Sequence, residues 1–85
     1  MKVELSQNAI DDLLAFKSGN QNLVIKVMEL IKDILRSPFD GLGKPEPLKH
    51  EYQGCWSRRI SDEHRLIYQM EENKIIVLSC KGHYA

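Results

Sequence analysis

The sequence of 85 residues predicts an α+β fold, in which an N-terminal strand and a two-helix hairpin are followed by an antiparallel β-meander. Two observations predict it. Between residues 6 and 37 apolar residues recur every three or four positions, which is typical of helices, and one glycine interrupts the pattern. From residue 48 onward short apolar and alternating runs are separated by turn-forming residues, which is typical of strands.

The first 37 residues predict a strand and two helices. Residues 1–5 alternate apolar and charged side chains, as a half-buried strand does. Ser6 is a suitable N-cap for a helix that ends at Gly19, and Asn20 can cap a second helix that runs to Ser37-Pro38. In a chain of this size we expect the second helix's wide apolar face to form core rather than a membrane or coiled-coil surface. That face consists of Leu23, Val24, Val27, Met28, Leu30, Ile31, Ile34 and Leu35.

The rest of the chain predicts an irregular connector and four strands. Residues 38–47 hold three prolines and two glycines, and the prolines on both sides of Glu46 restrict its backbone. We expect the last strand to be central in the sheet, because it is apolar on both faces. The four strands are expected over residues 48–51, 55–61, 65–70 and 75–80.

Alternation predicts which side chains share a face of the middle hairpin. If residues 62–64 form a three-residue loop, Ile60 lies opposite Leu66 on an apolar face. Arg58 and Tyr68 then share that face, so Arg58 needs a partner. Trp56 belongs to the same face, which favours core or dimer packing over base stacking. The opposite face is expected to carry Lys49, Arg59 and Arg65, with Glu46 at its edge.

Composition and charge limit the classes of function. Twelve basic and 12 acidic residues give a formal net charge of zero, so any contact with RNA must be local. No apolar run is long enough to span a bilayer and no export signal is found, so we expect a cytoplasmic protein. Cys55 and Cys80 are expected to be buried thiols. The three histidines form no recognisable ligand motif, so neither a metal nor a cofactor is expected.

The stretch from residue 44 to residue 65 places the acidic side chain of Glu46 among several basic ones. Glu46 is surrounded in the sequence by Lys44, Lys49, Arg58, Arg59 and Arg65. A carboxylate among cations can move protons beside a bound phosphate, and the terminal His83 and Tyr84 can join it. We therefore predict an RNA-cleaving site. The alternatives are a solvated sheet face and a frayed chain end.

Four motifs in a fixed order resemble the YoeB/Txe toxins of the RelE superfamily, over essentially the whole chain. They are K-P-E-P-L-K at 44–49, W-S-R-R-I at 56–60, H-R-L-I-Y at 64–68 and H-Y at 83–84. The resemblance implies that residues 1–85 form a single RelE-like, microbial-RNase-like toxin domain of a type II toxin–antitoxin pair. It implies cleavage of mRNA in the ribosomal A site. The implied partners are a YefM/Phd-type antitoxin, the ribosome with its mRNA, a second toxin copy, and operator DNA through the antitoxin complex alone.

The resemblance also implies roles for individual residues. Glu46 would be the general base, Arg65 would stabilise the transition state, and His83 would be the general acid. Tyr84 would help to orient the nucleotide. The cations implied to hold the RNA backbone are Lys49 and Arg59, with His50, Lys44 and Lys81 nearby. These groups suit metal-independent cleavage, in which the adjacent 2′-OH attacks the phosphate and leaves a 2′,3′-cyclic phosphate.

Two other functions stay open. One is a RelE-fold module that cuts weakly or not at all and acts in antitoxin binding and operon autoregulation. The intact residues Glu46, Arg65 and His83 argue against it. The other is an RNase that is independent of the ribosome. A net charge of zero and a single carboxylate at the site favour dependence on ribosomal RNA for positioning instead.

The C-terminal tail departs from the family pattern. Lys81 and Gly82 precede His83 where an arginine and a bulky residue are common, and Ala85 follows the usual terminal tyrosine. Lysine keeps the charge but lacks the bidentate fork of arginine, and glycine frees the backbone. We therefore expect a tail that is mobile in the absence of a partner.

Overall fold

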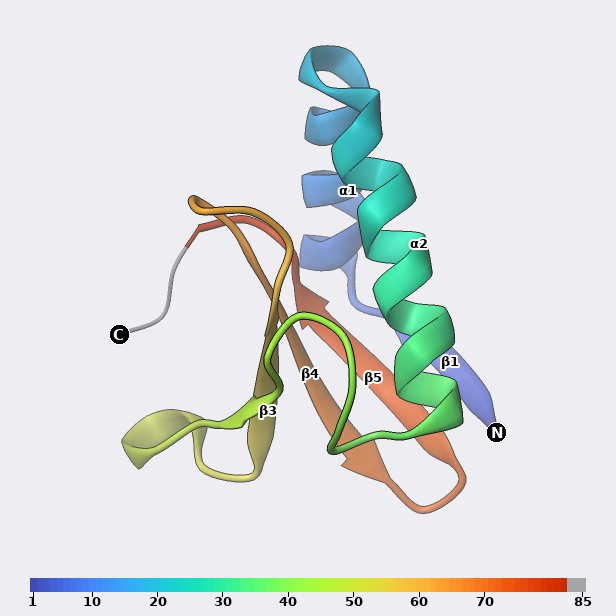
Figure 1. Cartoon of the computed structure of the whole chain (residues 1–85), viewed down its shortest axis with the longest axis vertical. Helices are drawn as coiled ribbons and strands as arrows, with labels where there is room; N and C mark the ends of the chain where they lie inside the picture. Colours follow the sequence, from blue (N-terminus) through green and yellow to red (C-terminus); the bar gives the residue numbers. More distant parts are fainter. Residues whose placement is uncertain (83–85) are drawn as a thin grey trace.

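The computed structural model describes residues 1–82 and places two helices against one face of a five-stranded sheet (Figure 1). The predicted α+β class is confirmed. In chain order the elements are β1 (Lys2–Leu5), α1 (Gln7–Gly19), α2 (Gln21–Arg36), β2 (Glu46–Pro47), a 3-10 helix (His50–Tyr52), β3 (Cys55–Arg59), β4 (Arg65–Glu71) and β5 (Lys74–Ser79).

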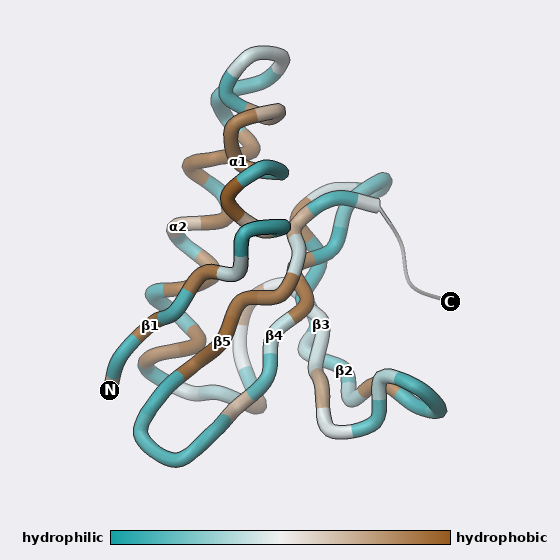
Figure 2. The backbone as a smooth tube through the Cα atoms, turned by 180° about the vertical axis from the view of Figure 1, so that it is seen from behind, coloured by the Kyte–Doolittle hydropathy of each residue, from teal (hydrophilic) through white to brown (hydrophobic). Residues whose placement is uncertain are grey.

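The strands lie in the order β1-β5-β4-β3-β2. The three contacts among β2, β3, β4 and β5 are antiparallel, as predicted for a meander. Strand β1 runs parallel to β5 at the edge of the sheet, so the first and last strands of the chain lie side by side (Figure 2). Strand β5 is therefore an interior strand, as its apolar sequence indicates, while β4 occupies the middle.

Both helices begin at the capping residues that the sequence predicts. The Ser6 hydroxyl accepts the Ala9 N–H at 3.0 Å and donates to the Leu78 carbonyl at 2.7 Å, so one side chain caps α1 and attaches it to β5. Asn20 accepts the Asn22 N–H at 3.1 Å and is the single residue between the helices. Over residues 1–82 no helix is long and apolar enough to cross a membrane.

The core lies between the helices and the even-numbered side chains of β3 and β4. On α2, Val27, Leu30 and Ile34 are fully buried, whereas Met28 and Leu35 remain 49% and 40% exposed. The apolar face of α2 is thus wider than the surface it contacts. The buried cluster contains Ala9, Phe16, Val27, Leu30, Ile31 and Ile34 from the helices and Ile60, Leu66, Tyr68, Ile75, Val77 and Cys80 from the second half of the chain.

The strand predicted over residues 48–51 is wrong. Strand β2 is only two residues long, Glu46–Pro47, and one further backbone bond from the Leu48 N–H to the Cys55 carbonyl, at 2.9 Å, ends the pairing with β3. His50 then takes a positive φ of 59°, which no extended strand can accommodate, and the chain continues as a turn of 3-10 helix.

The predicted register of the β3–β4 hairpin is displaced by two residues. Arg58 lies opposite Leu66 and Arg59 opposite Arg65, because residues 60–64 form a five-residue connection instead of a three-residue one. A displacement of two residues keeps every side chain on its own face. The predicted division of β3 and β4 into an apolar face and a charged face is therefore confirmed.

Arg58 is fully buried, and Asp33 in α2 is the charged partner that the sequence required. All five N–H groups of the guanidinium have an acceptor. These are the Asp33 carboxylate at 2.5 Å, the Tyr68 hydroxyl at 3.2 Å, and the carbonyls of Ser37, Asp40 and Leu42 at 2.6, 3.0 and 3.1 Å. The connector after α2 thus wraps around one side chain and takes its shape from it.

The end of the connector lies close against β3. The Gly43 carbonyl accepts the Arg59 N–H at 2.6 Å, and Gly43 has φ +77°. A Cβ at Gly43 would lie 2.9 Å from the Arg59 carbonyl oxygen, so only glycine permits this approach. Backbone hydrogen bonds therefore join the chain to β3 on both sides of Glu46, through Gly43 before it and through Leu48 after it.

Replacing Asp33 tests the ion pair through its pH dependence. The Leu42 N–H and the guanidinium groups of Arg58 and Arg36 lower the pKa of Asp33 from 3.8 to about 2. The stability that the ionised carboxylate contributes is therefore present above pH 3.8 and is lost as the pH falls towards 2. We expect Asp33→Asn to lower the free energy of unfolding at neutral pH and to converge with the wild type near pH 2, in urea titrations. A gap of equal size at every pH would contradict this role.

Gly43→Ala tests the close approach of the connector to β3. Gly54 is a matched control, because it also has a positive φ, of 95°, but an added Cβ there meets nothing within 4 Å. We expect Gly54→Ala to cost the backbone strain alone, about 1–2 kcal/mol of unfolding free energy, and Gly43→Ala to cost more. Urea denaturation measures both. Equal losses would show that the crowding at Gly43 is relieved without consequence.

Candidate functional site

Three residues of the predicted site share the sheet face that is turned away from the helices. The odd-numbered side chains of β3 and β4 lie there, with Ser57 opposite Ile67 and Arg59 opposite Arg65. Glu46 in β2 pairs with Ser57, which places its side chain on the same face. The structure therefore brings a carboxylate and two guanidinium groups together around a buried serine.

Arg65 is fixed more firmly than Arg59. Its Nη1 donates to the Ser57 hydroxyl at 3.3 Å, and its backbone N–H donates to the Gly82 carbonyl at 3.0 Å. Arg59 is exposed, while Arg65 is half-buried. Like charges directly opposite each other destabilise a pair of strands, and an anion between them removes this cost. The pair of arginines is therefore suited to bind a phosphate group.

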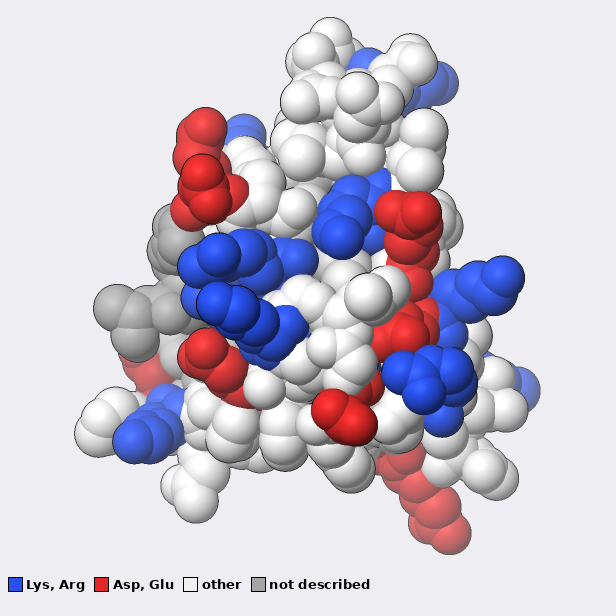
Figure 3. Space-filling model, viewed as in Figure 1, with Lys and Arg blue, Asp and Glu red and all other residues white. Residues whose placement is uncertain are grey.

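The Glu46 carboxylate faces solvent. Within residues 1–82 no hydrogen bond or ion pair engages it, in contrast to the carboxylate of Asp33. A carboxylate in this state can accept a proton from a bound molecule. Figure 3 shows lysine and arginine side chains gathered on the side of the molecule where β3 and the end of the connector lie.

The other predicted cations lie around this face. Lys44, Lys49, His50 and Lys81 are all exposed, and in the described part of the chain none of them bonds to Glu46 or Arg65. The prediction that Lys49 joins the face by strand alternation does not hold, because residues 48–51 are not a strand. Lys49 instead precedes the 3-10 turn that begins at His50.

The chain end approaches the site through Gly82, the last residue described. Its N–H donates to Nδ1 of His64 at 3.0 Å, and its carbonyl accepts the Arg65 N–H. Gly82 is thus bound on both sides beside Arg65. The predictions for His83, Tyr84 and Ala85 lie outside the described residues. Of the tail predicted to be mobile, residues 82–85, the structure describes Gly82 alone, and its peptide makes two hydrogen bonds.

Two contributors to the site had no role in the sequence-based prediction. Ser57 shares a face with Arg59 by strand alternation, but its contact with Arg65 follows only from a side chain that reaches across the strands. His64 precedes Arg65 in the H-R-L-I-Y motif, yet nothing in the spacing indicates that it binds the chain end 18 residues further on. Such non-local contacts leave no periodic signal in a sequence.

The two cysteines and the histidines bear on metal binding. Cys55 and Cys80 are free and buried, as predicted, and burial raises the pKa of the Cys80 thiol to about 12. Among residues 1–82 no three His, Cys, Asp or Glu side chains converge to hold a metal ion.

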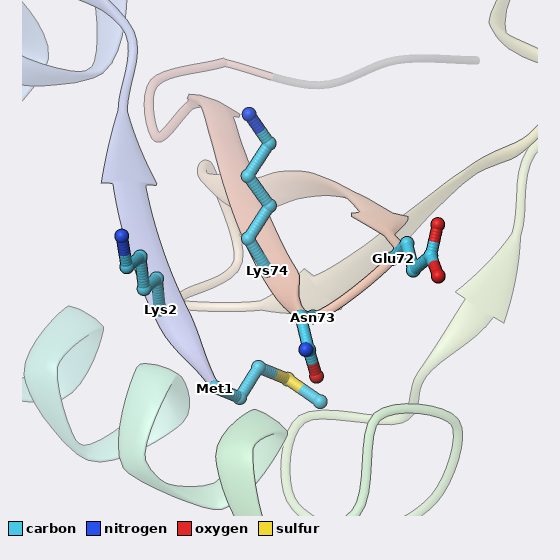
Figure 4. Close-up of a pocket in the computed structure, with 5 residues that line it drawn as sticks. All are labelled: Met1, Lys2, Glu72, Asn73 and Lys74. Atoms are coloured by element: carbon cyan, nitrogen blue, oxygen red, sulfur yellow. The ribbon is translucent and has the colours of Figure 1, made fainter.

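A surface hollow at the β4–β5 turn is not part of this face. It is lined by Met1, Lys2, Glu72, Asn73 and Lys74. Lys2 and Lys74 extend in the same direction, whereas Glu72 points away from both (Figure 4). Lys74 is engaged in ion pairs with Glu4 and Glu71. The hollow therefore lacks the convergent acid and base that the β2–β3–β4 face offers.

The chain resembles known proteins over nearly its whole length. Residues 5–84 match the model of the YoeB-like toxins of bacterial type II toxin–antitoxin systems. Toxin YoeB of Escherichia coli K12 is 46% identical over 84 residues, which cover 99% of this chain and 100% of that protein.

Solved structures agree with these matches. A YoeB/ParE toxin from Agrobacterium tumefaciens is 40% identical with a TM-score of 0.95, covering 99% of this chain and 100% of that one. YoeB from Staphylococcus aureus, solved as a dimer, is 41% identical with a TM-score of 0.91, and in its complex with YefM it is 42% identical with a TM-score of 0.89. Both S. aureus structures cover 99% of this chain and 98% of theirs. The fold implied by the sequence motifs is confirmed, and the chain belongs to the family of YoeB-like toxins of bacterial type II toxin–antitoxin systems.

Proposed function

We propose that this protein is a metal-independent endoribonuclease that cleaves mRNA in the ribosomal A site and so inhibits translation. One observation carries the proposal: Glu46, Arg59 and Arg65 share one sheet face, and the chain end that leads to His83 begins beside Arg65. Membership in a family of toxins supports it. Residues 1–85 would act as a single toxin domain.

Each step of the proposed cleavage is assigned to a group of this chain. Glu46 takes the proton of the 2′-OH, whose oxygen attacks the adjacent phosphorus. Arg65 stabilises the charge that builds up on the phosphorane. As the bond from phosphorus to the 5′-oxygen breaks, His83 gives that oxygen a proton, and Tyr84 orients the nucleotide. The products are a 2′,3′-cyclic phosphate and a 5′-hydroxyl.

The state of the described side chains supports these assignments. The exposed Glu46 carboxylate has no partner within residues 1–82, so its oxygens are available to a ligand. Arg65 is held by a side-chain hydrogen bond to Ser57 and a backbone hydrogen bond to Gly82, which gives a fixed cation where charge develops. Arg59 is exposed and free to follow the RNA backbone, as are Lys44, Lys49, His50 and Lys81 around the face.

The shape and charge of the molecule support dependence on the ribosome. The net charge is zero, so long-range attraction of RNA is weak. The candidate site is a sheet face with one carboxylate and two arginines rather than an enclosed cavity. A site with few groups gains most when the substrate arrives already positioned, and the A site of a ribosome supplies that positioning.

The proposal includes protein partners in the cytoplasm. The S. aureus relatives were solved as a dimer and with YefM, and we propose a homodimer and a YefM/Phd-type antitoxin for this chain too. Ile10, Leu14, Ile25 and Met28 on the helices are 44 to 58% exposed, an apolar surface of the kind that protein partners cover. Operator DNA would be contacted through the antitoxin complex alone.

Glu46→Gln and His83→Gln test the assigned base and acid. Each variant should fold and bind antitoxin normally, and cutting of ribosome-bound mRNA should fall at least about 100-fold, since a positioned acid or base contributes that much. Primer extension on initiated ribosomes measures the rate. Glu51→Gln is the matched control, because Glu51 is an exposed carboxylate in the 3-10 turn. A normal rate in either site variant would refute the role of that residue.

The products and the ribosome requirement test the proposal as a whole. Wild-type protein should cut within the A-site codon and leave 2′,3′-cyclic phosphate ends, because the attacking group is the 2′-OH of the substrate. Equal cutting of free RNA would favour a ribosome-independent nuclease. Products that carry only 3′-hydroxyl ends would exclude the mechanism, and no cutting in either sample would favour a module that only binds antitoxin.

A further inference from the structure

We propose that His64 is a positioning residue that fixes the point from which the C-terminal tail leaves the sheet. Its Nδ1 accepts the N–H of Gly82 at 3.0 Å, and His83 is the next residue in the chain. The kinetic consequence of this contact rests on the proposed function. The contact itself can be tested without it.

The His64 ring is held between α1 and the chain end. On one side it packs against the Phe16 ring, with centroids 5.0 Å apart and planes inclined by 53°. On the other side it meets Gly82. Because a backbone N–H can only donate, Nδ1 must accept, and the proton of the neutral ring is on Nε2.

The backbone of His64 is also fixed, so the ring is presented in one place. The His64 carbonyl accepts the N–H groups of Ile60 and Ser61 at 3.0 and 3.1 Å. The His64 N–H donates to the Ser61 hydroxyl at 3.2 Å, and the same hydroxyl accepts the Glu63 N–H at 3.3 Å. These bonds close the 60–64 connection into a rigid turn.

The two bonds to Gly82 act as a pair. Its N–H is bound by the side chain of His64 and its carbonyl by the backbone of Arg65, two adjacent residues where the 60–64 connection meets β4. One bond alone would let the peptide rotate, whereas two bonds fix its direction relative to Arg65. The tail therefore starts from a defined position next to the cation assigned to the phosphorane.

A histidine needed only for packing on Phe16 would not require a nitrogen directed at the chain end. Without the His64 acceptor, Gly82 keeps only its bond to Arg65, and the proposed acid at His83 should occupy its working position for less of the time. Such a loss lowers kcat. It leaves KM unchanged, because the exposed cations that would hold the RNA backbone, such as Arg59, are untouched.

Two substitutions separate the acceptor from the ring. His64→Phe keeps an aromatic ring against Phe16 but removes the acceptor. His64→Asn removes the ring but places an amide oxygen near the position of Nδ1. We expect His64→Phe to lower kcat on ribosomes about tenfold, the factor that corresponds to one net hydrogen bond, with KM unchanged. His64→Asn should retain the wild-type kcat although it is the less stable of the two.

Activity that follows stability instead, with His64→Phe at the wild-type kcat and His64→Asn impaired, would overturn the proposal and leave a packing role. Urea unfolding gives the stability order, and antitoxin binding confirms that both variants are folded.

Hydrogen exchange of the Gly82 amide tests the contact independently of cleavage. The amide should be protected in the wild type and in His64→Asn, and should exchange at least about tenfold faster in His64→Phe, the factor of one net hydrogen bond. If the wild type cuts no mRNA, the proposed function fails while this comparison still decides the role of His64. Equal protection of Gly82 in wild type and His64→Phe would overturn the inference whatever the cutting assay gives.

Discussion

The buried guanidinium of Arg58 dictates the path of the chain between α2 and β3. A charge removed from water is very costly unless every polar contact is replaced, and here five acceptors replace them. Three of these acceptors are backbone carbonyls of residues 37–42, which belong to no helix or strand. A segment outside helices and strands lacks their regular backbone hydrogen bonds, so its conformation depends on contacts of this kind. The segment that ends in Glu46 is therefore ordered by hydrogen bonds to a buried charge, together with the packing of the Phe39 ring on Trp56.

Two adjacent arginines in β3 have different environments, one buried and one exposed, because successive side chains of a strand point to opposite faces. Arg58 points into the core and is completely satisfied, whereas Arg59 points to the open face opposite Arg65. The first is part of the framework, and the second is exposed on the sheet face where the RNA site is proposed. The same strand also carries Ser57, whose hydroxyl accepts a hydrogen bond from the Arg65 guanidinium. A single extended segment thus connects the interior to the candidate site.

Local patterns predict the helices, their caps at Ser6 and Asn20, and the two faces of the sheet, because each is determined by neighbours in the sequence. Side chains along a strand alternate with a period of two, so this pattern is the same for registers that differ by two residues. The displacement of the β3–β4 hairpin therefore could not be predicted from it. The choice of Asp33 as the partner of Arg58, the place of β1 beside β5, and the contact of His64 with Gly82 depend on the assembled fold.

For the candidate site, the sequence correctly places Glu46, Arg59 and Arg65 on one face. Lys49 was assigned to the same face by strand alternation. That assignment fails because the strand does not continue into the 3-10 turn that begins at His50. The two cases differ physically. Pairing between strands keeps the alternation of side chains between the two faces, whereas the positive φ of His50 ends that alternation and leaves no mark in the hydropathy of the sequence.

The parallel pairing of β1 with β5 also governs when the fold can be completed during synthesis. Lys2 lies opposite Lys74, and Ser6 bonds to Leu78, 72 residues further along the chain. Contacts of such long range can form only after the last strand has emerged from the ribosome that makes it. The helices can form earlier, but the sheet edge cannot. A nascent copy therefore keeps β1 unpaired until β5 has been made and has left the ribosome.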